Sequence, residues 1–83
     1  MSLLLKYFHF GDHGLYYGNY GGLEYSAGTE NGTITGTSLD PEPVDAYDQV
    51  FYEHDLALQQ ASSTEERLEA HVNVITGVYD LLF

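Results

Sequence analysis

A three-residue link, Ala61-Ser62-Ser63, joins two segments with helical periodicity and limits the possible folds more than any other part of the sequence. The first segment begins at Pro43, which suits a first helical position, and Asp45 lies in its first turn, where the helix dipole favours acids. Ser63-x-x-Glu66 is a capping box for the second segment. Because the link is so short, we expect the two helices to pack antiparallel.

Each segment has an apolar face with the spacing of an amphipathic helix. On the first helix these residues are Val44, Tyr47, Val50, Phe51, Ala57, Leu58 and Ala61, with His54 at the centre. On the second they are Leu68, Val72, Ile75, Tyr79 and Leu82, widened by Val74, Val78 and Leu81, with His71 on the same side. The pattern predicts that the two faces meet, which brings His71 or Asn73 to about the level of His54.

The first 40 residues have a different character. Residues 2–10 are a short apolar run that is compatible with a helix or a strand. Five glycines in residues 11–22 oppose a regular helix and permit positive φ angles. Residues 23–39 are predicted to form a β-hairpin that turns at Asn31-Gly32. We therefore expect a single domain over residues 1–83, mainly α, with two antiparallel helices, a glycine-rich loop and one small hairpin.

The charge of the chain limits the classes of molecule that it can bind. Thirteen acidic residues and two basic ones give a formal net charge of -11, which opposes binding to nucleic acids and to anionic membranes. A hard divalent cation such as calcium suits this balance, although acidity also serves solubility alone. The chain has no cysteine, so it has no disulfide or thiolate site and is compatible with the cytoplasm or a virion. No stretch approaches the roughly 20 apolar residues of a membrane span.

His54-Asp55 is the most informative pair, because a histidine at the centre of an apolar helix face is an unusual placement. A lone histidine there is more often a core residue bonded to a backbone carbonyl. Residues 43–58, however, resemble the active-site helix of the phospholipase A2 family, D-x-C-C-x-x-H-D-x-C-Y, with matches at Asp48, His54 and Asp55. Apolar residues occupy the cysteine and tyrosine positions: Val50, Phe51, Ala57 and Leu58. The cysteine-free phospholipase A2 domains of parvovirus capsid proteins look most similar.

The glycine-rich segment resembles the calcium loop of the same family, Y-G-C-Y-C-G-x-G-G. The matching residues are Tyr17, Gly18, Tyr20 and Gly22. The resemblance implies a calcium ion held by the main-chain carbonyls of Tyr20, Gly22 and Glu24 and by the Asp55 carboxylate. Calcium takes six to eight oxygen ligands, and glycines allow several carbonyls to converge on it.

The function implied by this resemblance is calcium-dependent hydrolysis of the sn-2 ester of phospholipids, at a phospholipid or membrane interface. His54 would act as general base toward water, and calcium with the Gly22 N–H would stabilise the oxyanion. The family orients its histidine with an Asp on the second helix, and no Asp stands at that level here. His71, Asn73, Asp80, a residue outside the chain, or no residue at all remain the alternatives.

Three further interpretations stay open at the level of sequence. The chain is also compatible with a non-catalytic phospholipase A2-like binding module. It is compatible as well with a small acidic interaction protein, and with a homo-oligomer or a domain of a longer parent protein. His9, Asp12 and His13 form a weaker candidate metal cluster ahead of the glycine-rich segment.

Overall fold

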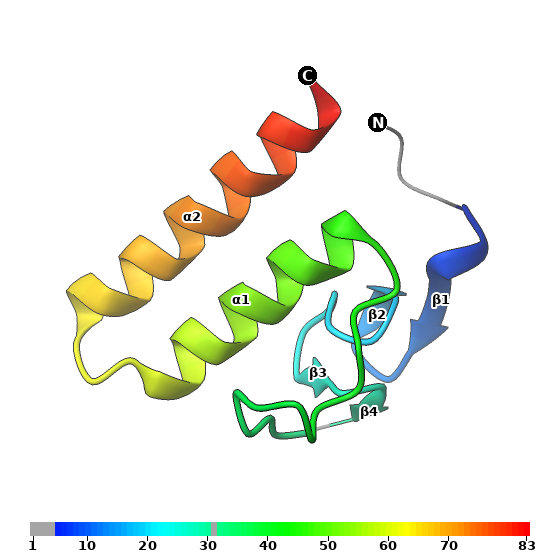
Figure 1. Ribbon diagram of the computed structural model, residues 1–83, viewed down its shortest axis with the longest axis horizontal. Coiled ribbons are helices and arrows are strands. Elements are labelled where there is room, and N and C mark those ends of the chain that lie inside the picture. The colour runs from blue at the N-terminus through cyan, green and yellow to red at the C-terminus, as the bar shows by residue number, and fades with distance from the viewer. Residues whose placement is uncertain (1–4, 31) are drawn as a thin grey trace.

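The computed structural model describes residues 5–30 and 32–83. In chain order the elements are a 3₁₀ turn η1 (Leu5–Tyr7), strands β1 (Phe8–Gly11), β2 (Gly14–Tyr17), β3 (Tyr25–Ser26) and β4 (Thr29–Glu30), and helices α1 (Ala46–Gln60) and α2 (Thr64–Leu82). The two helices run antiparallel, and the four short strands lie beside α1, away from α2 (Figure 1). The expected antiparallel helix pair is therefore confirmed.

The prediction of a mainly α chain with one hairpin and a calcium loop is wrong. Two separate two-stranded antiparallel sheets, β1-β2 and β3-β4, accompany the helices, and strand makes up 17% of the described residues. The segment that resembles the calcium loop, residues 17–24, begins at the end of β2 and folds back on itself, because Tyr17 and Gly21 exchange backbone hydrogen bonds of 2.7 and 2.9 Å. The earlier part of the glycine-rich segment forms a strand. The reason is side-chain pairing: Phe8 lies opposite Tyr17, with ring centroids 4.8 Å apart, and aromatic cross-strand pairs of this kind stabilise strands despite nearby glycines.

The hairpin predicted for residues 23–39 is shorter than expected and turns elsewhere. The hairpin formed by β3 and β4 turns at Ala27-Gly28, with φ angles of 55° and 72°. Two positive φ angles are what the common two-residue hairpin turn requires. Asn31 itself lies outside the described residues. For residues 2–10, periodicity did not decide between a helix and a strand. The described part of this segment contains the 3₁₀ turn η1 and most of strand β1.

Capping residues place both helices. Asp45 is the N-cap of α1 and accepts a hydrogen bond from the Asp48 N–H at 2.9 Å, so the helix begins three residues after the predicted position at Pro43. The predicted capping box of α2 is confirmed: the Ser63 hydroxyl accepts from the Glu66 N–H at 3.1 Å, and the Glu66 carboxylate accepts from the Ser62 N–H at 3.2 Å. These bonds satisfy backbone donors that the first helical turn leaves open.

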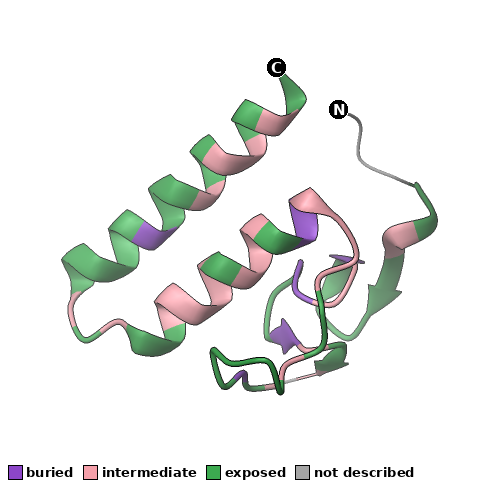
Figure 2. Ribbon diagram, viewed as in Figure 1, coloured by how far each residue is buried: buried purple, intermediate pink, exposed green. Residues whose placement is uncertain are grey.

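Tyrosines dominate the core. The buried apolar residues are Tyr16, Tyr17, Tyr20, Tyr25, Ile34, Tyr47 and Ala70. The Tyr16 and Tyr25 rings stack at 4.3 Å and join the two small sheets. Figure 2 shows that the buried positions gather around the strands and the start of α1, whereas α2 is largely open to solvent. The core therefore supports α1, the helix that carries His54 and Asp55.

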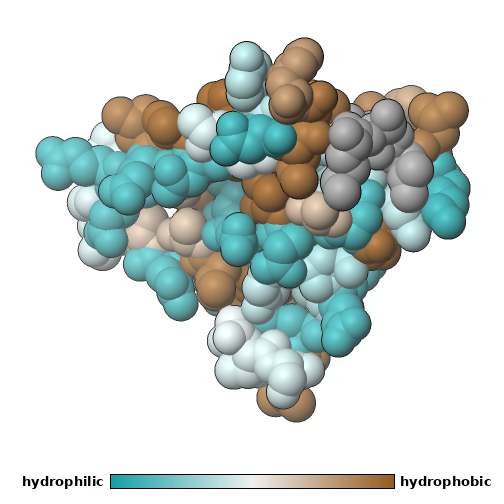
Figure 3. All heavy atoms as spheres, turned by 45° about the horizontal axis from the view of Figure 1, so that its top comes forward, coloured by the Kyte–Doolittle hydropathy of each residue, from teal (hydrophilic) through white to brown (hydrophobic). Residues whose placement is uncertain are grey.

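The predicted apolar stripe of α2 does not face α1. Its five residues are exposed by 41–67% of their surface: Leu68, Val72, Ile75, Tyr79 and Leu82. Instead, α2 turns other residues toward α1: Ala70 is buried, and a Cβ atom on Gly77 would lie 2.8 Å from a Val50 methyl group. The residues predicted to widen the stripe are half-buried: Val74, Val78 and Leu81. Part of α1 is already covered by the sheets, through contacts such as Phe51 against Tyr17. Figure 3 shows hydrophobic side chains open at the surface.

Candidate functional site

The buried carboxylate of Asp48 fixes the backbone of residues 18–20, which precede the candidate site. Asp48 has no exposed surface and accepts three backbone N–H bonds, from Asn19 at 3.0 Å, Tyr20 at 2.9 Å and Val44 at 2.9 Å. Gly18 has φ 58°, and a Cβ there would meet the Asp48 carboxyl carbon at 2.5 Å, so only glycine permits this approach. Asp48, which the sequence marked only as a family match, thus anchors residues 18–20 to α1.

His54 projects from α1 toward α2. Its Nε2 atom lies 3.1 Å from Nδ1 of His71, so His71 is in direct contact with it among the residues named above as alternatives. Asn73 and His54 both line a cavity of about 300 Å³ between the helices, and Asp80 is exposed toward the far end of α2. Burial lowers the pKa of His54 below its ordinary value, and the neighbouring His71 lowers it further. Near pH 7 the imidazole of His54 is therefore mostly neutral, as a general base requires.

Asp55 follows His54 and is buried more deeply, with a side chain only 15% exposed. The Ser26 hydroxyl donates a hydrogen bond to its Oδ2 atom, and His54 Nδ1 lies 3.8 Å from its Oδ1 atom, too far for a direct hydrogen bond. Burial raises the pKa of Asp55 to about 7, with a smaller contribution from the charge of Asp48, while the Ser26 bond acts in the opposite direction. This carboxylate is therefore desolvated without a cationic partner in the described part of the chain.

His54 and Asp55 open into a pocket of about 340 Å³. Gly22 and Glu24, two of the predicted calcium ligands, line the same pocket. The full lining is Gly22, Leu23, Glu24, Tyr25, Ser26, Gly32, His54, Asp55, Leu58, Gln59 and His71. Ser26 is the residue that sequence reasoning missed, because no motif marks a serine that reaches the site from a short strand.

Tyr20, the remaining predicted ligand, does not line this pocket. Its side chain is buried, its N–H bonds to Asp48, and its hydroxyl donates to the Pro41 carbonyl. Burial raises the pKa of its phenol to about 12, with further contributions from Asp40 and other nearby groups. Tyr20 is therefore buried outside the pocket lining, and three of the four residues predicted as calcium ligands line the pocket.

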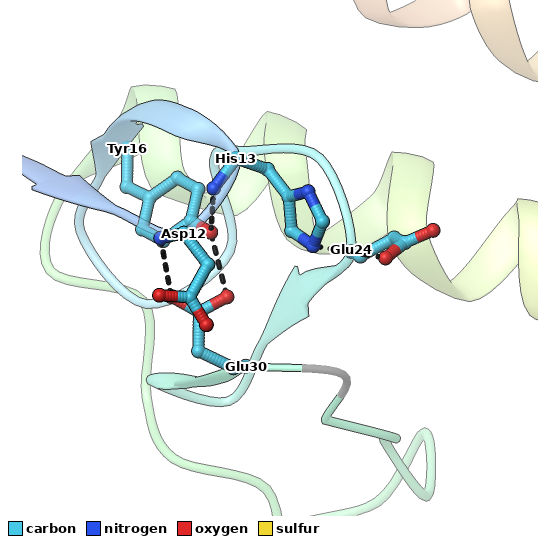
Figure 4. A network of polar contacts seen from close by, with 5 residues as sticks. All are labelled: Asp12, His13, Tyr16, Glu24 and Glu30. Carbon is cyan, nitrogen blue, oxygen red and sulfur yellow. Dashed lines mark hydrogen bonds and ion pairs between the residues drawn. The ribbon is translucent and has the colours of Figure 1, made fainter.

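The Glu24 side chain is engaged outside the pocket. Its carboxylate lies 3.0 Å from His13 Nε2, on the turn between β1 and β2 (Figure 4). Glu24 also has φ 51°, an uncommon angle for a residue with a side chain. Its main chain, rather than its carboxylate, is therefore left for a ligand in the pocket, as the family resemblance implies.

The second candidate metal cluster is not assembled. His9 Nε2 lies 3.1 Å from the Gly18 carbonyl, whereas His13 pairs with Glu24. The Asp12 N–H donates to Glu30, whose carboxylate also accepts from the Tyr16 hydroxyl at 2.6 Å (Figure 4). These side chains tie the β1-β2 turn to β4 and to the Gly22–Glu24 segment, so their evident role is structural.

The donors around Asp55 suit a hard cation in kind, because a carboxylate, a serine hydroxyl and main-chain carbonyls are all oxygen ligands. Within residues 5–30 and 32–83, no group of three or more His, Asp or Glu side chains is placed to hold a metal ion. A cation at Asp55 would thus depend on main-chain and water oxygens for most of its coordination.

In the part of the chain that the structure describes, neither helix is long and apolar enough to cross a membrane. Comparison with protein-family models, curated proteins and solved structures finds no match. Functional assignment therefore starts from the geometry of the pocket.

Proposed function

We propose that the pocket hydrolyses the sn-2 ester of phospholipids, with His54 as general base. The observation that supports this most is the contact between His54 Nε2 and His71 Nδ1, at 3.1 Å, across two helices and beside a buried acid. A general base needs a partner on one ring nitrogen so that the other nitrogen is fixed toward the reacting water. The desolvated Asp55, next in the chain, supplies a neighbouring ligand group in the same pocket.

The reaction requires one tautomer of the histidine pair. His54 Nε2–H donates to His71 Nδ1, which leaves the lone pair of His54 Nδ1 free in the pocket. His54 Nδ1 removes a proton from water while the water oxygen attacks the ester carbonyl carbon. The tetrahedral intermediate then expels the lysophospholipid alkoxide, which takes that proton back from His54, and a fatty acid is released.

Calcium bound at Asp55 and at main-chain oxygens of Gly22 and Glu24 would supply positive charge for the phosphate and the developing oxyanion. The residues of the chain do the rest. Ser26 fixes the Asp55 carboxylate in one orientation through its hydroxyl. Asp48 holds residues 18–20 against α1 and so determines where the following pocket segment begins.

The pocket rim matches a lipid ester. Leu23 is 67% exposed at the pocket, and Leu58 also lines it, so apolar groups stand beside the polar centre as an acyl chain requires. The net charge of -11 favours zwitterionic over anionic headgroups. We therefore assign phosphatidylcholine-like lipids as the substrate class.

The direct test measures release of a fluorescent sn-2 acyl chain from phosphatidylcholine vesicles, with calcium and then with a chelator. Wild-type protein should release the chain only with calcium, and His54→Gln should lose roughly 100-fold or more of the rate. His9→Gln is the matched control, because it removes a histidine outside the pocket lining. Unchanged cleavage by His54→Gln would exclude His54 as the base.

The role of His71 has a separate test. His71→Asp places a carboxylate against His54 Nε2, which stabilises the imidazolium better than a neutral imidazole does. We expect this variant to cleave faster than wild type, with Asn73→Asp as the control for adding one negative charge to the same helix. No gain over that control would refute the orienting role of the residue at position 71.

A non-catalytic binding module is the second candidate, and one observation favours it. The residue that contacts His54 is a histidine, which cannot carry the negative charge that the family's carboxylate provides. This candidate predicts that calcium raises Tm while no ester is cleaved by the wild type. An absence of any response to calcium would instead favour the small acidic interaction protein.

A further inference from the structure

The exposed stripe of α2 has the spacing of a helix–helix seam. Its residues Leu68, Val72, Ile75, Tyr79 and Leu82 are separated by 4, 3, 4 and 3 positions. This alternation keeps apolar residues on one line of a helix and is the pattern by which two helices pair along their length. In the part of the chain that the structure describes, these five residues stay 41–67% exposed, whereas Ala70 and Gly77 on the same helix pack close to α1.

The stripe is also part of a shallow apolar groove. A hollow of about 420 Å³ lies between α1 and α2, and its lining is Phe51, Val74, Ile75, Val78, Tyr79 and Leu82. The terminal Phe83 is 89% exposed, and its ring lies 4.8 Å from that of Tyr79. Exposed groups of this size on a small, strongly charged domain are characteristic of an interaction surface.

The area of the stripe suits a specific interface. Together with Phe83, its side chains leave on the order of 700 Å² open on each chain, close to the roughly 800 Å² that each partner contributes to a standard interface. By area alone, therefore, contact with a second surface of the same size would cover the whole stripe.

The charges beside the stripe decide which partner fits. The residues that flank its middle are His71, Thr76 and Val78, none of them acidic. The acids nearest to it, Glu65 and Glu69, are confined to the first turns of α2, and its C-terminal end is Leu81-Leu82-Phe83. A basic partner would find little opposite charge along the middle of this stripe, whereas a second copy would meet no like charge there.

The positions of these acidic residues also indicate whether the two helices of a pair run parallel or antiparallel. A parallel pair would place Glu65 and Glu69 of both copies side by side at one end. An antiparallel pair instead sets each acidic end beside the apolar C-terminal end of the other copy and opposes the two helix dipoles. With Ile75 in the middle of the stripe, Leu68 of one copy then faces Leu82 of the other.

We propose that two copies of this chain pair through the α2 stripe, antiparallel and centred on Ile75, to form a homodimer. The twofold axis passes between the two Ile75 side chains, so the same residues contribute from both copies. Each chain carries -11, and screening of this repulsion by salt should strengthen the dimer.

Sedimentation equilibrium measures the association over a range of protein and salt concentrations. Wild-type protein should form dimers, with a dissociation constant that falls as sodium chloride is raised from roughly 20 to 500 mM. Ile75→Glu should weaken the dimer by roughly 100-fold or more, because it sets two negative charges against each other at the axis. Leu39→Glu is the control, since Leu39 is 84% exposed and lies outside α2. Circular dichroism verifies that both variants keep their helices.

Cysteine cross-linking tests the register, because the wild-type chain has no cysteine. Under mild oxidation Ile75→Cys should give a covalent dimer. Leu68→Cys alone should not, but an equimolar mixture of Leu68→Cys and Leu82→Cys should cross-link. Self-cross-linking of Leu68→Cys would instead indicate a parallel pair and overturn the proposed arrangement.

Two results would overturn the proposal as a whole. One is a wild-type chain that stays monomeric at all protein and salt concentrations. The other is binding of the monomer to phosphatidylcholine vesicles that Ile75→Glu abolishes, which would assign the stripe to a lipid surface. Neither result depends on ester cleavage, so the dimer and the proposed hydrolase activity stand or fall separately.

Discussion

Replacing Asp55 with asparagine should stabilise the fold near neutral pH in the absence of metal. The Asp55 side chain is 15% exposed, and burial raises its pKa from an ordinary value of 3.8 to about 7. The folded protein therefore holds a proton at Asp55 that the unfolded chain releases between pH 4 and 7. Because the folded state binds more protons in this window, its stability falls as pH rises through it. Asparagine cannot ionise, and its amide oxygen can still accept the Ser26 hydrogen bond.

The pKa values set the size of the effect. The difference between 3.8 and about 7 corresponds to about 4 kcal/mol, at 1.36 kcal/mol for each pKa unit. For a domain of this size, a gain of that order raises Tm by roughly 15 °C or more. We expect the stability difference between Asp55→Asn and wild type to grow by this amount from pH 4 to pH 7 and then to level off.

Urea unfolding at half-unit pH intervals, with a chelator present, measures the difference. Asp80→Asn is the matched control, because it removes one acid from an exposed position on α2 and thereby corrects for the general relief of negative charge. Addition of calcium should then stabilise wild type by about 2.7 kcal/mol at a concentration 100 times its dissociation constant, and Asp55→Asn much less.

Two results would refute this reasoning. If the Asp55→Asn and Asp80→Asn proteins followed the same pH dependence, the Asp55 carboxyl would not be desolvated as the structure indicates. If calcium stabilised both equally, Asp55 would not be a calcium ligand, whatever its pKa.

Three further changes test other parts of the fold. Asp48→Ala should cost about 3 kcal/mol or more in urea unfolding, because it leaves three backbone N–H groups without their acceptor, each worth roughly 1–3 kcal/mol when buried; a loss below 1 kcal/mol would contradict that role. Asp40→Asn should lower Tm at pH 7 but not at pH 2. Burial opposes ionisation of Asp40, yet hydrogen bonds from Thr35, Tyr52 and Gly36 outweigh this effect and lower its pKa to about 2. The contribution of the Asp40 carboxylate to stability is therefore present above pH 4 and is lost as pH falls toward 2. Gly77→Leu should destabilise the helix pair by roughly 1–3 kcal/mol through overpacking against Val50, whereas the exposed Thr76→Leu should not.

Some features of this protein could be predicted from the sequence because they depend on residues that are close together in the chain. The Ser63-Glu66 capping box and the short link between the helices act over a few residues, and the structure contains both as predicted. The link length and the helical rise also predicted that His71 or Asn73 lies at the level of His54, and His71 is in contact with it. Ala27-Gly28, whose Gly28 N–H bonds to the Asn19 carbonyl, forms the turn between β3 and β4, whereas Asn31 of the predicted turn lies outside the described residues.

Other features depend on contacts between distant segments. The first helix was predicted to meet the stripe of α2, but contacts with the sheets, such as Phe51 against Tyr17, take up part of its surface. Nothing local distinguishes a helix face that meets a neighbour from one that stays exposed. Periodicity alone therefore could not show that Gly77 would pack against Val50 while Ile75 remained exposed.

The sequence by itself determined the two helices, the N-terminal cap of the second, their antiparallel order and the proximity of His54 to a polar residue on the second helix. The tertiary structure alone decided that His71 is that residue, that Ser26 reaches Asp55, and that Tyr20 is buried outside the pocket lining. The physical reason is range. Capping and periodicity are set by neighbours within one or two turns, whereas burial, and with it the raised pKa of Asp55, arises from segments that meet only in the folded chain.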